Sequence, residues 1–247
     1  MTGFHFSIDD VFDCLIETSE RGIAAEAQPV LAFCRALAEE GALTDLYLFR
    51  RGVGPDGALA RLDDLSPAAR DSLRRLEGVR FGPHAEDYAT APHAQTLDEQ
   101  TRTFEGLFAA IDRFAGEEQR ARWLRLHYFS ECHELAPLWR AHGVEALLTT
   151  DKPAIAYRLP PQEREVLARQ GSVMVDGLRF IRSHLRLESF ADEAADPPRF
   201  LARVDAALEM HGFVTLFTHE IDLADARVRA LALASIRHLV ARGATAL

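Results

Sequence analysis

The sequence predicts an α/β fold, a (β/α) barrel of about seven parallel strands. Short apolar runs alternate with longer helical patterns along the chain. The apolar runs lack the polar alternation of strands with one wet face, so both of their faces are expected to be buried. Polar residues gather directly after these runs. The 247 residues, 48% of them hydrophobic, suffice for one large core, and we expect a single domain over residues 1–247.

The individual elements follow from the same patterns. The predicted strands are residues 4–8, 45–49, 78–83, 123–129, 145–149, 178–187 and 213–218. The predicted helices are residues 29–41, 96–115, 133–142, 197–211 and 226–242. Asp176-Gly177 predicts a hairpin turn between residues 173–175 and 178–180. We expect a flexible loop at 52–57, a less regular region from Pro160, and an acidic loop at 192–198. Seven strands with polar residues gathered at their carboxyl ends favour a closed barrel over an open sheet.

Composition narrows the class of protein. The formal net charge of -10 disfavours general binding to nucleic acids or anionic membranes. No run of about 18 apolar residues predicts a membrane span, and the first residues lack a signal-peptide pattern. The three cysteines, Cys14, Cys34 and Cys132, are odd in number and widely spaced, which indicates reduced thiols. We therefore expect a cytoplasmic protein.

The first predicted strand ends in two adjacent carboxylates, Asp9 and Asp10. Adjacent acids at the end of a buried strand repel each other and lose hydration, which is costly. Such a cost usually accompanies a metal, a substrate or a proton-transfer role. The alternative is that one of the two side chains caps the following helix.

Other predicted strands carry polar residues at the same end. His84 follows the third strand, the fourth contains Arg125, His127 and Tyr128, and His219 follows the last. Because the carboxyl ends of parallel strands meet at one rim, we expect these side chains to converge with the two aspartates. Carboxylate, imidazole and guanidinium groups together are what a hydrolytic metal site requires.

Four short motifs carry a resemblance that spans almost the whole chain. They are Ser7-Ile8-Asp9-Asp10-Val11, His84-Ala85-Glu86-Asp87-Tyr88, Arg125-Leu126-His127-Tyr128-Phe129 and Leu216-Phe217-Thr218-His219. In order, they are similar to the T-F-D-D-G, H-[ST]-x-x-H, R-x-P-Y-G and L-x-H motifs of polysaccharide deacetylases of the NodB-like type. The chain thus resembles that family, whose fold is a distorted barrel of about seven strands.

The resemblance implies a metal-dependent hydrolase of an amide or N-acetyl C–N bond, acting on a sugar or sugar conjugate. It implies Asp9 as general base, Asp10 and His84 as metal ligands, Arg125 as the residue that orients the base, and His219 as general acid. The implied cofactor is a divalent metal, Zn²⁺ first, with Co²⁺, Ni²⁺ or Mn²⁺ as alternatives. A metal, a carboxylate base and an imidazole acid are also what amide hydrolysis needs chemically.

The chain departs from the family motifs at the metal site. Tyr88 stands in place of the second ligand histidine, and either His93 or His127 could supply the missing ligand. Tyr88 and Tyr128 are candidate substrate contacts. Arg182 and His184 are further candidates, if their strand turns them into the barrel mouth rather than to a solvated edge.

Three functions stay open at this point. The first is the hydrolase, with a sugar nucleotide, a lipid-linked sugar or a small amide as substrate. The second is a catalytically inactive barrel that binds a carbohydrate or nucleotide sugar. The third is a hydrolase that uses Cys132 as nucleophile. A small-molecule or glycan partner is expected in each case, and the sequence leaves the oligomeric state open.

Overall fold

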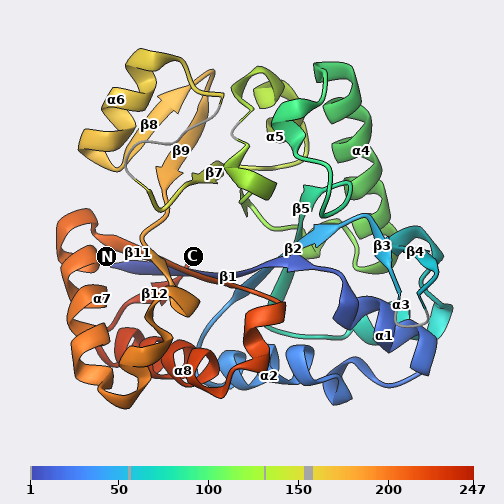
Figure 1. Ribbon diagram of the computed structural model, residues 1–247, viewed down its shortest axis with the longest axis horizontal. Coiled ribbons are helices and arrows are strands. Elements are labelled where there is room, and N and C mark those ends of the chain that lie inside the picture. Colours follow the sequence, from blue (N-terminus) through green and yellow to red (C-terminus); the bar gives the residue numbers. More distant parts are fainter. Residues whose placement is uncertain (1, 55–56, 131, 153–157) are drawn as a thin grey trace.

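The computed structural model describes residues 2–54, 57–130, 132–152 and 158–247 (Figure 1). The strands are β1 (Gly3–Val11), β2 (Thr44–Phe49), β3 (Arg51–Val53), β4 (Leu59–Arg61), β5 (Val79–Ala85), β6 (Trp123–Leu124), β7 (Ala146–Thr149), β8 (Ser172–Val175), β9 (Leu178–Arg182), β10 (Leu185–Arg186), β11 (Phe213–His219) and β12 (Thr245–Ala246). The helices are α1 (Asp13–Arg21), α2 (Pro29–Glu39), α3 (Pro67–Arg74), α4 (Leu97–Phe114), α5 (Ala136–Ala141), α6 (Pro161–Gln170), α7 (Pro197–His211) and α8 (Ala226–Ala241).

Two sheets form the wall of a distorted barrel. The larger sheet has the order β10-β11-β1-β2-β5, with β12 beside β1, and all of its pairs are parallel. The smaller sheet has the order β6-β7-β9-β8, in which only β8 runs antiparallel. Because β1, β5 and β11 run in the same direction, the residues that follow them meet at one end of the barrel.

The two sheets approach each other at two seams. On one side, β5 lies beside the segment that leads into β6, where Phe81 bridges Arg120. Gly82 permits this close approach, since a Cβ atom there would lie 2.6 Å from Cδ2 of Leu124. On the other side, only Ser183 and His184 separate β9 of one sheet from β10 of the other. One interrupted strand therefore links both sheets.

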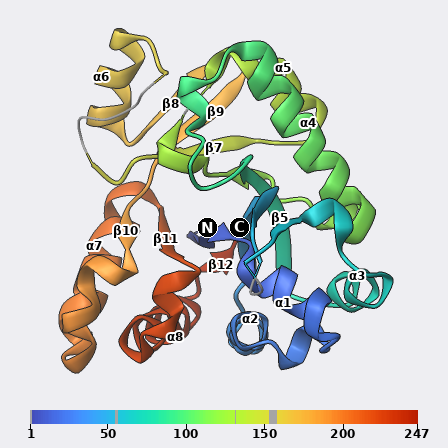
Figure 2. The same cartoon turned by 45° about the vertical axis from the view of Figure 1, so that its right-hand side comes forward.

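The core explains why these segments form strands and helices. Phe4, Phe6 and Ile8 of β1 are fully buried, as expected for a strand covered on both faces. Figure 2 shows helices around the outside of the strands, with α2 and α8 on the side of β1. The α4 helix begins with a capping box, in which Thr96 and Glu99 each bond to the other's backbone N–H.

The seven predicted strands and five predicted helices are all present, with corrected ends. The fourth predicted strand contracts to β6, because residues 127–129 turn as a short 3₁₀ helix. The sixth divides into β9 and β10. The predicted hairpin is confirmed as β8–β9, with Asp176 and Gly177 at positive φ.

Three segments expected to be irregular contain regular structure. Residues 52 and 53 of the predicted flexible loop belong to β3, which pairs with β4, while residues 55 and 56 lie outside the described part of the chain. The helix α6 starts at Pro161, whose fixed φ suits a first helical position. The acidic segment before α7 is a 3₁₀ helix, Leu187–Ala195. The helix expected after the first strand is α1, for which the sequence analysis gave no limits, and α3 was missed.

Candidate functional site

Three side chains from separate strand ends converge on one point at the barrel mouth. Oδ1 of Asp10 lies 2.9 Å from Nε2 of His84 and 3.1 Å from Nδ1 of His127. Asp10 is near the end of β1, His84 near the end of β5, and His127 in the turn after β6. Both histidines are buried, and Asp10 is partly buried. Burial alone would raise the pKa of Asp10, but the two imidazoles, when protonated, donate hydrogen bonds to its carboxylate and hold the pKa well below its usual range.

The outer nitrogens of both imidazoles are fixed by backbone carbonyls. Nδ1 of His84 lies 2.6 Å from the carbonyl oxygen of Arg125, and Nε2 of His127 lies 3.0 Å from that of Tyr88. A carbonyl oxygen only accepts, so these nitrogens carry the protons. In a neutral imidazole the other nitrogen then presents a lone pair to Asp10. Metal-ligating histidines are held by this kind of outer hydrogen bond.

The oxygen at the centre of this cluster lacks a donor. Oδ1 of Asp10 is buried and has no hydrogen-bond partner of good geometry. A carboxylate oxygen and two imidazole lone pairs approach so closely only around a shared cation or an added proton. One oxygen and two nitrogen ligands form a donor set that suits Zn²⁺ and similar divalent metals. The three residues therefore fit the metal that the sequence motifs imply.

Backbone strain gathers at the same place. Asp10, Tyr128 and Phe129 have φ values of 58°, 54° and 52°, and these are three of the four non-glycine residues at positive φ in the described part of the chain. Bulky side chains rarely adopt this region, which costs about 1–3 kcal/mol per residue. The strain turns Asp10 away from the regular course of β1, where the pairing with β2 also shifts register.

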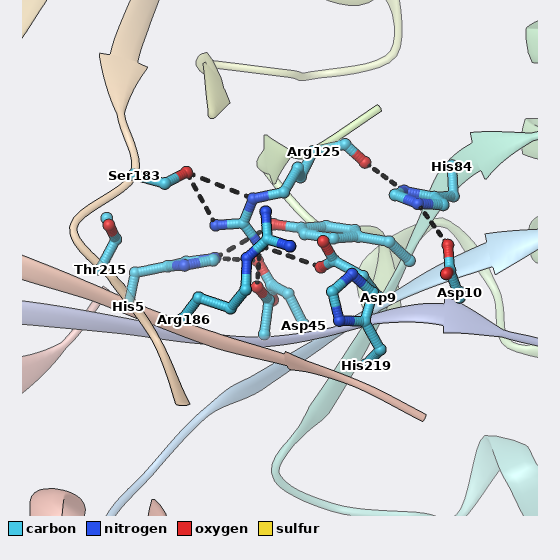
Figure 3. Close-up of polar contacts among 12 residues, drawn as sticks. His5, Asp9, Asp10, Asp45, His84, Arg125, Ser183, Arg186, Thr215 and His219 are labelled. Carbon is cyan, nitrogen blue, oxygen red and sulfur yellow. Dashed lines mark hydrogen bonds and ion pairs between the residues drawn. The ribbon is translucent and has the colours of Figure 1, made fainter. Parts of the chain in front are cut away.

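A buried ion pair lies beside the three candidate ligands. Nη1 of Arg125 donates to Oδ1 of Asp9 at 2.9 Å and to Oγ of Ser7 at 2.7 Å. Ser183 accepts from Nε and Nη2 of the same guanidinium, at 3.3 and 3.1 Å. The guanidinium carbon lies 3.8 Å from the ring centre of Phe217. Arg125 is thus locked on several sides and fixes the orientation of the Asp9 carboxylate (Figure 3).

His219 lies at the end of β11, next to Asp9 in the close-up (Figure 3). Its Nδ1 is 2.7 Å from Oε1 of Glu188 and 3.4 Å from Oδ2 of Asp222. Burial alone would lower the pKa of His219. The hydrogen bond to Glu188 and the nearby charge of Asp9 outweigh burial and raise the pKa to about 9. The imidazole is therefore protonated at neutral pH and is suited to act as an acid.

A cavity of about 520 Å³ opens beside this group. Asp10 and His219 form part of its wall, so a molecule bound there reaches both. The aromatic rings of Phe49 and Tyr88 also face it, and the Tyr88 side chain is 66% exposed. The site therefore has a place for a substrate next to the candidate ligands and the candidate acid.

The other candidate residues are divided between the site and its surroundings. Tyr128 is half exposed, and its ring centre lies 4.2 Å from that of His127. Arg182, at the end of β9, donates to the carbonyl oxygen of Asp151. His93 does not join the ligand cluster, because its Nδ1 lies 3.0 Å from Oγ of Ser130. The structure thus brings His127, rather than His93, to Asp10 and His84.

The structure does not bring His184 to this group. Its Nδ1 accepts from the backbone N–H of Thr215, near the start of β11, and its ring stacks on His211 at 4.5 Å. The start of a strand lies at the opposite end of the barrel from the mouth. The strand is interrupted at Ser183, between β9 and β10. The alternation of side chains along β9 therefore does not predict the direction of the His184 side chain.

Cys132 is also unsuited to nucleophilic attack. Burial and the nearby Glu134 raise the pKa of its thiol to about 12, so the thiolate is scarce at neutral pH. The neighbouring His133 turns to Asp176 and Glu134 instead of the thiol.

Two residues of the site were missed in the sequence. Glu188 follows the predicted strand 178–187 directly, so the signal used for the other strand ends could have identified it. Ser183 lies inside that predicted strand, and nothing in the local pattern marks it as the partner of Arg125.

No helix in the described residues combines the length and apolar character needed to cross a membrane. No protein-family model matches the sequence, and no curated protein is detectably similar to it. Solved structures do share the fold. A 4-alpha-glucanotransferase from Thermococcus litoralis aligns with a TM-score of 0.59 at 11% identity, over 100% of this chain and 39% of that one. The chain therefore spans less than half the length of the glucanotransferase.

Two deacetylases align over nearly their full length. A putative polysaccharide deacetylase from Mycobacterium smegmatis has a TM-score of 0.54 at 11% identity, over 99% of this chain and 93% of that one. The polysaccharide deacetylase of Bacillus cereus has a TM-score of 0.51 at 12% identity, over 99% and 90%. At such identities the alignments show a shared fold, the distorted (β/α) barrel that the sequence predicts. The activity has to be argued from the residues of the candidate site.

Proposed function

We propose that this protein is a metal-dependent hydrolase of an amide C–N bond that removes an acyl group, such as acetyl, from a sugar or sugar conjugate. The observation that carries the proposal is the convergence of Asp10, His84 and His127, whose potential ligand atoms all lie within 4.8 Å of one another. The deacetylases with the same fold support the substrate class by analogy.

The geometry supports the roles that the resemblance implies. A divalent cation held by Asp10, His84 and His127 would polarise the acyl oxygen and lower the pKa of water. Asp9 accepts a proton from the attacking water, because Arg125 fixes its carboxylate in one orientation. His219 donates a proton to the leaving nitrogen, and Glu188 fixes the ring in the orientation that this transfer needs. Hydrolysis then releases a carboxylate and an amine.

His127 resolves the difficulty that Tyr88 raises. With Tyr88 at the second histidine position, the sequence motifs alone leave the metal site one ligand short. An inactive binding module would account for such a site. His127 supplies a third ligand atom from the turn after β6. Three protein ligands with an open position are typical of catalytic zinc sites. The hydrolase is therefore favoured over a carbohydrate or nucleotide-sugar binding module.

A cytoplasmic location belongs to the same proposal. It is supported by the three cysteines, all buried and none in a disulfide bond.

Turnover of an amide panel tests the proposal. The protein is freed of metal by a chelator, reconstituted with Zn²⁺, Co²⁺, Ni²⁺ or Mn²⁺, and incubated with N-acetylated sugars, their oligomers and small amides. We expect acetate release that is lost with the chelator and restored by metal. His127→Ala abolishes release, and His93→Ala, the matched control, retains it. Release that survives chelation overturns the metal role, and binding of a sugar without release from any amide favours the binding module.

A further inference from the structure

The cavity beside the candidate site has an apolar wall. Its apolar lining residues are Phe12, Phe49, Val53, Tyr88 and Ile221. Val53 is 66% exposed and Ile221 80% exposed, so neither contributes much to the core. Single exposed apolar residues are common, but several gathered on one cavity next to a reactive centre indicate an apolar ligand.

This wall is built into the fold. The Phe49 ring lies edge-on to Tyr88 at 6.2 Å and to His127 at 4.9 Å, so the wall is continuous with a candidate metal ligand. The Phe12 ring lies against Gly52 of β3, where a Cβ atom would approach Cε1 of Phe12 to 2.6 Å. Only glycine lets the ring and the strand lie so close.

The charges of the cavity oppose an anionic ligand. Arg51 is the one arginine or lysine among the described residues that line it, and its guanidinium lies 2.8 Å from Asp87 and 3.5 Å from Glu86. Asp10, Asp13, Glu220 and Asp222 place four carboxylates in the lining. In the metal-free protein, a phosphate group placed here would meet these four carboxylates against one protonated imidazole, that of His219, and no uncompensated guanidinium.

On these grounds, and resting on the proposed function, we propose that the substrate carries an apolar group on the amine side of the scissile bond and no phosphate. The amine side is assigned because His219, the candidate acid for the leaving nitrogen, lines the cavity with the three residues that follow it, whereas Asp10 is the one candidate metal ligand in the described lining. The substrate class is then a neutral N-acetylated amino sugar with an alkyl or aryl aglycone. The carboxylates of the lining disfavour a nucleotide sugar and a lipid pyrophosphate.

Binding to the metal-free protein tests this without requiring turnover. The probes are N-acetylglucosamine, its octyl glycoside below the micelle concentration, and its uridine diphosphate ester, titrated by calorimetry. Each fully buried methylene strengthens binding about fourfold. The cavity is open on one side, so we expect at least tenfold tighter binding of the octyl glycoside than of the free sugar. We expect the diphosphate ester to bind no better than the free sugar.

Surface variants assign the effect to the wall. Val53→Ser combined with Ile221→Ser should remove most of the octyl preference. Met210→Ser, at an equally exposed apolar residue on α7 outside the cavity, should keep it. Equal binding of the free sugar and the octyl glycoside, or tighter binding of the diphosphate ester, overturns the inference even if acetate is released. A preserved octyl preference without acetate release overturns the proposed function and leaves the apolar site standing.

Discussion

Replacing Arg125 by methionine tests how the candidate base is held. The guanidinium is 1% exposed and donates to Asp9, which is 2% exposed. Methionine keeps much of the apolar stem of arginine but leaves a buried carboxylate without its cation. Removing one partner of a buried ion pair costs about 3–5 kcal/mol. For a chain of this length, each kcal/mol lowers the melting temperature by about 2–4 °C, so a fall of about 6–20 °C is expected.

The assay is denaturant unfolding of the metal-free protein at pH 7, with thermal unfolding alongside. The double variant Asp9→Asn with Arg125→Met serves as the control, because asparagine has the shape of aspartate without its charge. If the loss comes from an unpaired carboxylate, the double variant is more stable than Arg125→Met alone. An Arg125→Met protein within about 1 kcal/mol of wild type, or a double variant no more stable than the single one, would refute the reasoning.

Three further predictions concern the acid, a helix and the thiol. The pKa of His219 is raised to about 9, so amide hydrolysis should decline as the pH rises through about 9; Glu188→Gln should move this decline to lower pH, and an unchanged profile would count against the pairing. Thr96→Ala removes the capping box of α4 and should lower the free energy of unfolding by about 1 kcal/mol, whereas Thr101→Ala on the exposed face of α4 serves as the comparison. Treatment with a thiol-alkylating reagent should leave Cys132, which is buried and has a pKa raised to about 12, unmodified and hydrolysis intact, while a chelator stops hydrolysis; the reverse pattern would revive the thiol mechanism.

Much of the candidate site's placement could be predicted because its residues lie at strand ends. Asp9, Asp10, His84 and His219 directly follow or end buried apolar strands, and parallel strands carry their carboxyl ends to one rim. The pattern of burial along each strand is local, so the sequence reveals it. The helix α7 begins at a Pro-Pro pair and ends before a glycine, which is why its limits were predicted correctly.

The third ligand could not be chosen from the sequence. His127 reaches Asp10 because the chain leaves β6 after two residues and turns through Tyr128 and Phe129 at positive φ. A run of apolar and aromatic residues favours a continued strand, and tertiary packing overrides that local preference. The interruption of the strand at Ser183 could not be predicted either. The Ser183 hydroxyl contacts Arg125, which is distant in the sequence, and the local pattern does not show this contact.

Metal titration of His127→Ala beside His93→Ala tests the central claim most directly. Both variants remove one partly or fully buried histidine near the mouth, but only His127 lies against Asp10. We predict that wild type and His93→Ala bind about one equivalent of Zn²⁺, and that His127→Ala binds it at least about 100-fold more weakly. Equal affinity of His127→Ala and wild type, or a loss confined to His93→Ala, would contradict the assignment of Asp10, His84 and His127 as the metal site.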